Sequence, residues 1–119
     1  MTEDISEIWA NRRRHKRKYL LFKIPAYDAQ TRRFLGLVQD ITESGIQLYG
    51  VKGEVNTTRS IIIQASDYLK SPTLHFEAQC RWSRRESADD HYLSGFEITA
   101  INEEVQASLI KLIEFVTLG

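Results

Sequence analysis

Two short segments contain the residues whose types and spacing could do chemistry. The first, Arg12 to Lys18, places six cations within seven residues. The second, Asp40 to Gly45, begins 23 residues after Arg17 and places a carboxylate, a hydroxyl and a glycine at the predicted end of a strand. A cationic segment alone would suit any polyanion, because its charges neutralise phosphates without reading anything else. A cationic segment facing a fixed Asp/Thr/Gly edge favours an anion that also carries a hydrogen-bonding base, which is a nucleotide.

Each segment also has a plainer interpretation. Basic heptapeptides are often solvated tails, or they contact phosphates without reading sequence. Asp40 to Gly45 would also serve as a turn after a strand, with the Asp40 or Thr42 side chain bonded to nearby backbone and Gly45 at positive φ. A basic segment followed at this spacing by an Asp/Thr/Gly turn is less common than either segment alone, so the pair is more informative than its parts.

Composition narrows the class of protein. At 119 residues the chain is expected to form one domain around a single core. Its 16 Lys and Arg balance its 16 Asp and Glu, so no global field attracts nucleic acid or a membrane. The single cysteine, Cys80, excludes an intrachain disulfide and favours a reducing compartment. Residues 1–11 lack the apolar run of a signal peptide, and the longest apolar stretch, Tyr19 to Phe22, is too short to span a bilayer. We therefore expect a cytoplasmic protein.

Catalysis is not favoured by the sequence. It contains no GxSxG elbow, no P-loop and no GxGxxG pattern. His15, His75 and His91 are scattered, so no metal-ligand spacing is present. We expect His75 on the solvent face of a strand and Cys80 in the core. The prediction is a non-enzyme with no catalytic residues, no metal and no cofactor.

The hydropathy pattern predicts the secondary structure. Ile5, Ile8 and Trp9 lie on one face of a short N-terminal helix. Period-two alternation then predicts six strands: Leu20–Ala26, Phe34–Ile41, Gly45–Tyr49, Ser60–Ala65, Leu74–Trp82 and Tyr92–Ile98. The strand from Leu74 is the clearest, with an inward face made of Leu74, Phe76, Ala78, Cys80 and Trp82. A small antiparallel barrel is the fold that these strands favour.

A C-terminal helix is expected to close or pack against this barrel. Asn102 can cap it, and Glu103 and Glu104 in the first turn suit the positive end of the helix dipole. Its apolar stripe comprises Val105, Leu109, Leu112, Ile113 and Val116.

The chain resembles the PilZ domain family, a bacterial receptor module for cyclic di-GMP. The family signature is RxxxR ahead of the first barrel strand, followed about twenty residues later by [D/N]xSxxG. Arg13 to Arg17 fits the first element, and Asp40 to Gly45 fits the second with Thr42 in place of serine. Arg81-Trp82, Gly95-Phe96-Glu97 and the C-terminal helix extend the resemblance over nearly all of the chain from Arg12 onward.

This resemblance implies an all-β fold with a terminal helix: a six-stranded antiparallel PilZ-like barrel over residues 18–119, preceded by a short helical or flexible arm, residues 1–17. It implies a non-catalytic receptor in which the arm closes over cyclic di-GMP and presents a new surface to a downstream protein. The implied ligand-binding residues are Arg13, Arg17, Asp40, Thr42 and Gly45, with Arg12, Arg14, Ser44 and Trp82 as further candidate contacts. An arginine just before RxxxR accompanies an intercalated ligand dimer in this family, so Arg12 favours two ligands per chain.

The ligand chemistry agrees with these assignments. A guanidinium donates a planar fork to phosphate oxygens or to the O6/N7 edge of guanine. Asp40 can accept hydrogen bonds from the guanine N1–H and N2–H₂ donors, and Thr42 keeps the hydroxyl of the family serine while adding a methyl group. Two alternatives remain open: an interaction module that has lost the ligand, and a nucleic-acid binder that tracks phosphates through the basic arm. Zero net charge counts against the nucleic-acid binder.

Overall fold

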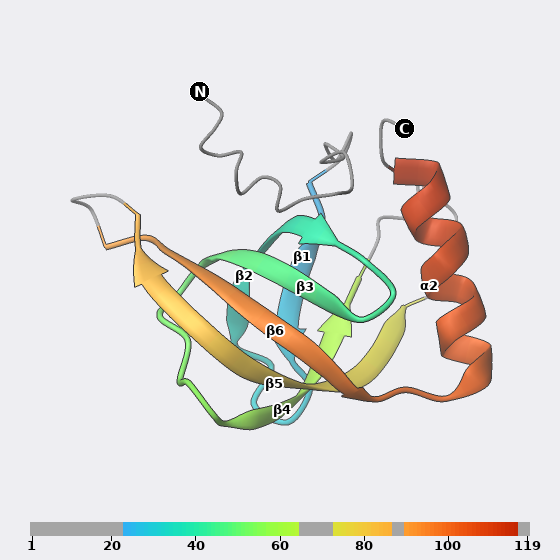
Figure 1. Ribbon diagram of the computed structural model, residues 1–119, viewed down its shortest axis with the longest axis horizontal. Coiled ribbons are helices and arrows are strands. Elements are labelled where there is room, and N and C mark those ends of the chain that lie inside the picture. The colour runs from blue at the N-terminus through green and yellow to red at the C-terminus, as the bar shows by residue number, and fades with distance from the viewer. Residues whose placement is uncertain (1–22, 65–72, 87–89, 117–119) are drawn as a thin grey trace.

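Six antiparallel strands close into a barrel, as the sequence predicts (Figure 1). Their order around the barrel is β1-β2-β3-β6-β5-β4. The computed structural model describes residues 23–64, 73–86 and 90–116. The strands are β1 Pro25–Asp28, β2 Phe34–Ile41, β3 Gly45–Gly50, β4 Thr58–Ile63, β5 Leu74–Arg85 and β6 Tyr92–Ala100. The arm of residues 1–17, with its predicted helix, lies outside the described residues, as does the start of the first predicted strand.

The boundaries differ from prediction mainly at strand ends. The first strand begins at Pro25 within the described chain, and β4 runs from Thr58 to Ile63 rather than from Ser60 to Ala65. Strand β5 continues to Arg85, three residues beyond its predicted end at Trp82. Its pairing with β6 explains this extension, because Arg84 and Arg85 lie opposite Leu93 and Tyr92. Long-range pairing here overrides the weak strand preference of charged residues.

Inward-facing aliphatic side chains fill the barrel. Burial alternates along β3 and through the first part of β5, where Cys80 is in the core and His75 is exposed, as predicted. The most deeply buried large hydrophobic residues come from the residue before β1, from three strands and from the helix: Ile24, Leu48, Ile61, Ile63, Leu74 and Leu109. Such burial provides most of the driving force for closing the barrel.

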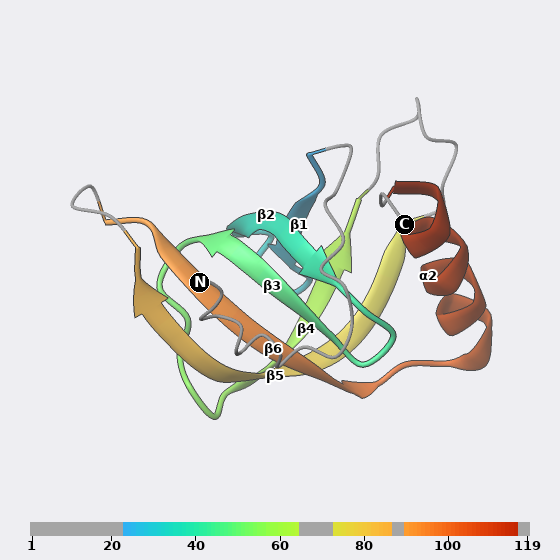
Figure 2. The same ribbon diagram turned by 45° about the horizontal axis from the view of Figure 1, so that its top comes forward.

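The C-terminal helix α2, Glu103–Val116, lies beside the barrel and packs against β5 (Figures 1 and 2). Asn102 caps it as predicted, since its Oδ1 accepts a hydrogen bond from the Val105 N–H at 2.8 Å. Of the predicted stripe, Leu109 and Leu112 are buried and Val105 and Ile113 are partly buried. No helix in the described part of the chain is long and apolar enough to cross a membrane.

The strand register shifts at four places in the described sheet, and two of these β-bulges lie next to the site described below. In β2, Val38 pairs with Leu48 and Asp40 with Gln47, so Gln39 is the extra residue. In β5, Cys80 pairs with Phe96 and Trp82 with Gly95, so Arg81 is the extra residue. Each bulge moves the following residue to the opposite face from the one that strict alternation would give it. Both bulged strands border the site described below.

A buried carboxylate joins the β1–β2 turn to β4. Asp28 Oδ1 accepts hydrogen bonds from the N–H groups of Gln30 and Thr31, at 2.8 and 2.9 Å, and Oδ2 accepts one from Arg59 at 2.8 Å. Burial alone would raise the pKa of Asp28, but these donors outweigh it and the pKa is lowered. Asp28 therefore stabilises the fold in its ionised form.

Candidate functional site

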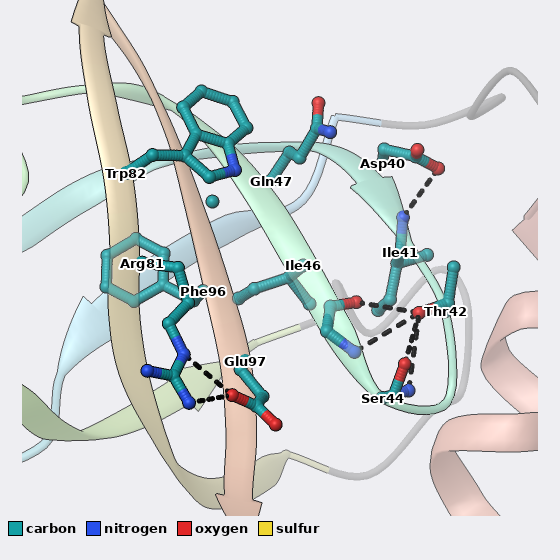
Figure 3. A pocket seen from close by; sticks show the side chains of 12 residues that line it. Asp40, Ile41, Thr42, Ser44, Ile46, Gln47, Arg81, Trp82, Phe96 and Glu97 are labelled. Atoms are coloured by element: carbon teal, nitrogen blue, oxygen red, sulfur yellow. Dashed lines mark hydrogen bonds and ion pairs between the residues drawn. The ribbon is translucent and has the colours of Figure 1, made fainter. Parts of the chain in front are cut away.

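An open depression of about 400 Å³ lies on the outer face of the barrel, across the end of β2, the β2–β3 turn, β3, β6 and β5 (Figure 3). It is lined by Asp40, Ile41, Thr42, Ser44, Gly45, Ile46, Gln47, Arg81, Trp82, Gly95, Phe96 and Glu97. Its size falls in the range of small-molecule sites. This lining includes all the candidate contacts from the sequence that lie within the described residues: Asp40, Thr42, Ser44, Gly45 and Trp82.

The β2–β3 turn is held by the hydroxyl of Thr42. Thr42 Oγ1 accepts hydrogen bonds from the N–H of Gly45 at 3.1 Å and of Ser44 at 3.3 Å, and it donates to the Gly45 carbonyl at 3.3 Å (Figure 3). The backbone N–H of Thr42 donates to the same carbonyl at 2.9 Å. A threonine keeps every one of these bonds that a serine would make. The departure from the family serine therefore preserves the turn.

Asp40 presents a carboxylate to the depression. Its Oδ1 accepts a hydrogen bond from the Ile41 N–H at 2.9 Å, which fixes the carboxylate against its own strand (Figure 3). Oδ2 has no hydrogen-bond partner among the described residues. The bulge at Gln39 places Asp40 on the outer face, since Val38 before the bulge and Ile41 after it are both buried. Asp40 thus offers an oriented acceptor to a ligand.

Glycine at position 45 is required by a close approach between strands. A Cβ on Gly45 would lie 2.6 Å from the Phe96 carbonyl oxygen on β6. Its φ is not positive, so the interpretation of Gly45 as a left-handed turn residue is wrong. The absence of a side chain lets β3 lie directly against β6 at the floor of the depression.

Trp82 forms one wall of the depression, and the prediction that it faces the core is wrong. The bulge at Arg81 moves it to the outer face, where Trp82 lines the depression (Figure 3). The indole lies against Gly95 of β6. A Cβ on Gly95 would lie 2.2 Å from Trp82 Nε1, so only glycine leaves room for the ring there. The Arg84 guanidinium carbon lies 5.3 Å from the indole centroid. The indole is thereby fixed as a flat aromatic surface beside the depression.

Arg81 and Glu97 form an ion pair on the opposite side of the depression from the β2–β3 turn (Figure 3). Arg81 donates from Nε to Glu97 Oε1 at 2.7 Å and from Nη2 to the same oxygen. The sequence did not mark these two residues, or Gln47, as candidate contacts. One signal could have found Gln47: it follows Gly45 by two residues and so shares its strand face.

Several sequence predictions fall outside this geometry. Arg12, Arg13, Arg14 and Arg17 lie outside the described residues, so their relation to the depression remains a prediction. Residues 23–64, 73–86 and 90–116 contain no group of three His, Cys, Asp or Glu side chains arranged to hold a metal ion. Cys80 is buried, and this burial raises the pKa of its thiol.

The described chain is thus a closed six-stranded barrel with a C-terminal helix and an open depression beside the β2–β3 turn. The chain belongs to the PilZ domain family, whose model matches residues 11–115. This is the family that the paired motifs indicated, and it comprises receptor and adaptor domains for cyclic di-GMP.

A solved structure has the same fold. The Bacillus subtilis inhibitor of motility, MotI/DgrA, superposes with a TM-score of 0.64 at 15% sequence identity. The match covers 83% of this chain and 48% of that protein, so the chain spans about half of its length. At this identity the likeness concerns the fold alone. No curated protein matches the chain significantly.

Proposed function

We propose that this protein is a non-catalytic receptor for cyclic di-GMP that binds its ligand in the depression between Asp40 and Trp82. The observation that carries the proposal is the pairing of an oriented carboxylate with an aromatic face in one open depression of a PilZ barrel. A carboxylate accepts from the N1–H and N2–H₂ donors of guanine, and an indole stacks on a purine ring. The depression thus offers both interactions that a guanine base needs.

The charges of the depression support a role for the basic arm in ligand binding. Its lining contains two carboxylates, Asp40 and Glu97, and one cation, Arg81, which is already paired with Glu97. A ligand with two phosphates would meet a wall with an excess of negative charge. The neutralising cations must come from elsewhere in the chain, and the basic heptapeptide Arg12 to Lys18 is the densest source. We therefore assign phosphate binding to Arg13 and Arg17.

Calorimetric titration of the full chain with cyclic di-GMP tests this function. We expect saturable binding that weakens as salt rises, because phosphate neutralisation contributes to it. Arg17→Ala should remove about 1.5–3 kcal/mol, roughly 10- to 100-fold in Kd, as a charge-assisted hydrogen bond is lost. Arg33→Ala is a matched control, because this exposed arginine lies at the other end of β2 from Asp40.

Two outcomes would contradict the proposal. Folded protein that shows no heat and no saturation at high micromolar ligand would leave the interaction-module alternative. Full-strength binding by Arg17→Ala, together with comparable affinity for other polyanions, would favour non-specific phosphate contact.

Closure of the arm over the ligand would complete the mechanism. Arg12 and Arg14 flank the motif arginine, and a spare guanidinium could stack on the guanine of a second ligand. Binding of a ligand dimer predicts a fitted stoichiometry of two per chain. Closure predicts slower hydrogen exchange of residues 2–17 with ligand than without, and equal exchange in both states would exclude it. The closed arm, ligand and barrel would form the surface that a downstream protein reads.

A further inference from the structure

The ion pair between Arg81 and Glu97 is the feature of the depression that the proposed function leaves unused. Both side chains are about half exposed, at 51% and 50%. Arg81 comes from the bulge of β5, and Glu97 lies on the adjacent strand β6. Exposed ion pairs contribute little to stability, so the fold does not depend on this one. Its place within the lining of the depression points to a role in binding instead.

The geometry of the pair leaves it open to exchange. Arg81 uses Nε and Nη2 on a single oxygen, Glu97 Oε1. Arg81 Nη1 and Glu97 Oε2 have no hydrogen-bond partner within the described part of the chain. A guanidinium can therefore move to a new acceptor by breaking contacts with one oxygen only. Phosphate oxygens are acceptors of matching geometry, because guanidinium binds them bidentately as it binds carboxylates.

The surroundings keep the pair accessible from the proposed binding site. Glu97 lies directly opposite Gly45 in the β3–β6 register. Because Gly45 has no side chain, the β3 residue directly opposite Glu97 places only backbone atoms beside it. Figure 3 shows Arg81 and Glu97 on one side of the depression and Thr42 and Ser44 on the other. A ligand held by Asp40 and Trp82 would lie within reach of Arg81.

We propose that Glu97 masks Arg81 in the ligand-free protein and that a phosphate of the ligand displaces Glu97 to bind this arginine. The inference rests on the proposed function and adds a barrel-wall cation to the arm arginines. Glu97 then acts as a built-in competitor for the anionic ligand, both by holding Arg81 and by its own negative charge. The masked pair sets the affinity and favours ligands with enough anionic charge to break it.

This arrangement predicts that the two partners of one ion pair have opposite effects on binding. Glu97→Gln frees Arg81 and removes a like charge, so cyclic di-GMP should bind roughly three- to fivefold more tightly, given the weak coupling of exposed pairs. Arg81→Ala removes the cation and leaves Glu97 facing the phosphates, so binding should weaken by about the same factor. In the Glu97→Gln background, Arg81→Ala should cost more than in the parent. All three effects should shrink at high salt.

Asp90→Asn is the matched control. It removes the same charge from another exposed ion pair, Arg85–Asp90, whose residues do not line the depression. Asparagine also tolerates the positive φ of 66° at this position. The difference between Glu97→Gln and Asp90→Asn therefore isolates the local effect from that of net charge. Circular dichroism of each variant establishes that the barrel is folded.

The titrations separate this inference from the proposed function. Opposite shifts for Glu97→Gln and Arg81→Ala, with Asp90→Asn near the parent, support the masked arginine. If the unchanged protein binds cyclic di-GMP but Glu97→Gln and Asp90→Asn have the same affinity, the masking proposal is wrong. The proposed receptor function is then unaffected. Weaker binding by Glu97→Gln also overturns it, and would assign Glu97 as an acceptor for guanine donors. A folded parent that does not bind overturns both proposals together.

Discussion

Replacing Gly95 by alanine tests whether the position of the Trp82 indole controls binding. The added Cβ would lie 2.2, 2.4 and 2.8 Å from three atoms of the indole, Nε1, Cε2 and Cζ2. Ordinary contact begins near 3.4 Å, so the ring would have to move by about 1.2 Å, the difference from the shortest of these distances. The clash lies with a side chain and not with the backbone, so the ring can turn away from the depression while the barrel persists.

The displacement should affect both stability and binding. Overpacking of this kind costs about 1–3 kcal/mol, which urea unfolding followed by circular dichroism can measure. If the indole stacks on guanine, its loss from the wall removes about 1–3 kcal/mol of binding, roughly 5- to 150-fold in Kd. Calorimetry with cyclic di-GMP measures this second effect.

A double-mutant cycle supplies the control. In a Trp82→Ala background the new methyl group meets no indole, so Gly95→Ala should change neither stability nor affinity by more than about 0.5 kcal/mol. Equal costs of Gly95→Ala in both backgrounds would refute the argument that its effect passes through Trp82. Unchanged binding by both single variants would show that the indole face is not used by the ligand.

Three further predictions concern the turn, the strand contact and the buried carboxylate. Asp40→Ala should weaken cyclic di-GMP binding by roughly tenfold or more in calorimetry, whereas Thr42→Ser, which keeps the hydroxyl of the turn, should bind at least as tightly as the parent; a large loss in Thr42→Ser would show that the methyl packs usefully. Gly45→Ala should lower the free energy of unfolding by about 1–3 kcal/mol, because its Cβ would lie 2.6 Å from the Phe96 carbonyl oxygen; an unchanged urea midpoint would contradict that approach. Asp28→Asn should destabilise the protein by about 1–2 kcal/mol at neutral pH. The folded pKa of Asp28 is lowered from 3.8, so its contribution is present above that value and disappears as the pH falls through the folded pKa. The free energy of unfolding of the unchanged protein and of Asp28→Asn should therefore converge at low pH. If the difference between them stays constant far below pH 3.8, ionised Asp28 does not stabilise the fold.

Local sequence was sufficient to predict the six strands, the C-terminal helix and the turn that carries the second motif. The N-cap of α2 joins Asn102 to Val105, and the hydroxyl bonds of the β2–β3 turn join Thr42 to Ser44 and Gly45. Each of these bonds spans at most three residues, so the residue types imply them directly. The alternation of apolar residues likewise identifies most of each strand, because one face of every strand is buried.

The reason for a glycine at position 45 came from the tertiary structure. The sequence interpretation invoked a left-handed turn, which is a local property, whereas the structure shows contact with Phe96 on a strand 51 residues further along the chain. Only the β3–β6 register brings these two backbones together. A glycine in a sequence indicates that a side chain would be unfavourable, but it does not say what the side chain would meet.

The composition of the depression's wall depended on the bulges and on strand pairing. The alternation of apolar and polar residues does not show where a β-bulge interrupts it. Alternation from Leu74 therefore placed Trp82 in the core. The bulge at Arg81 instead turns Trp82 outward, against Gly95. The ion pair joins Arg81 to Glu97 across 16 residues, through the pairing of β5 with β6. The sequence by itself therefore determined the family, the elements and the local turn. The tertiary structure alone decided which outward side chains share one surface, because that depends on register between strands that are distant in the chain.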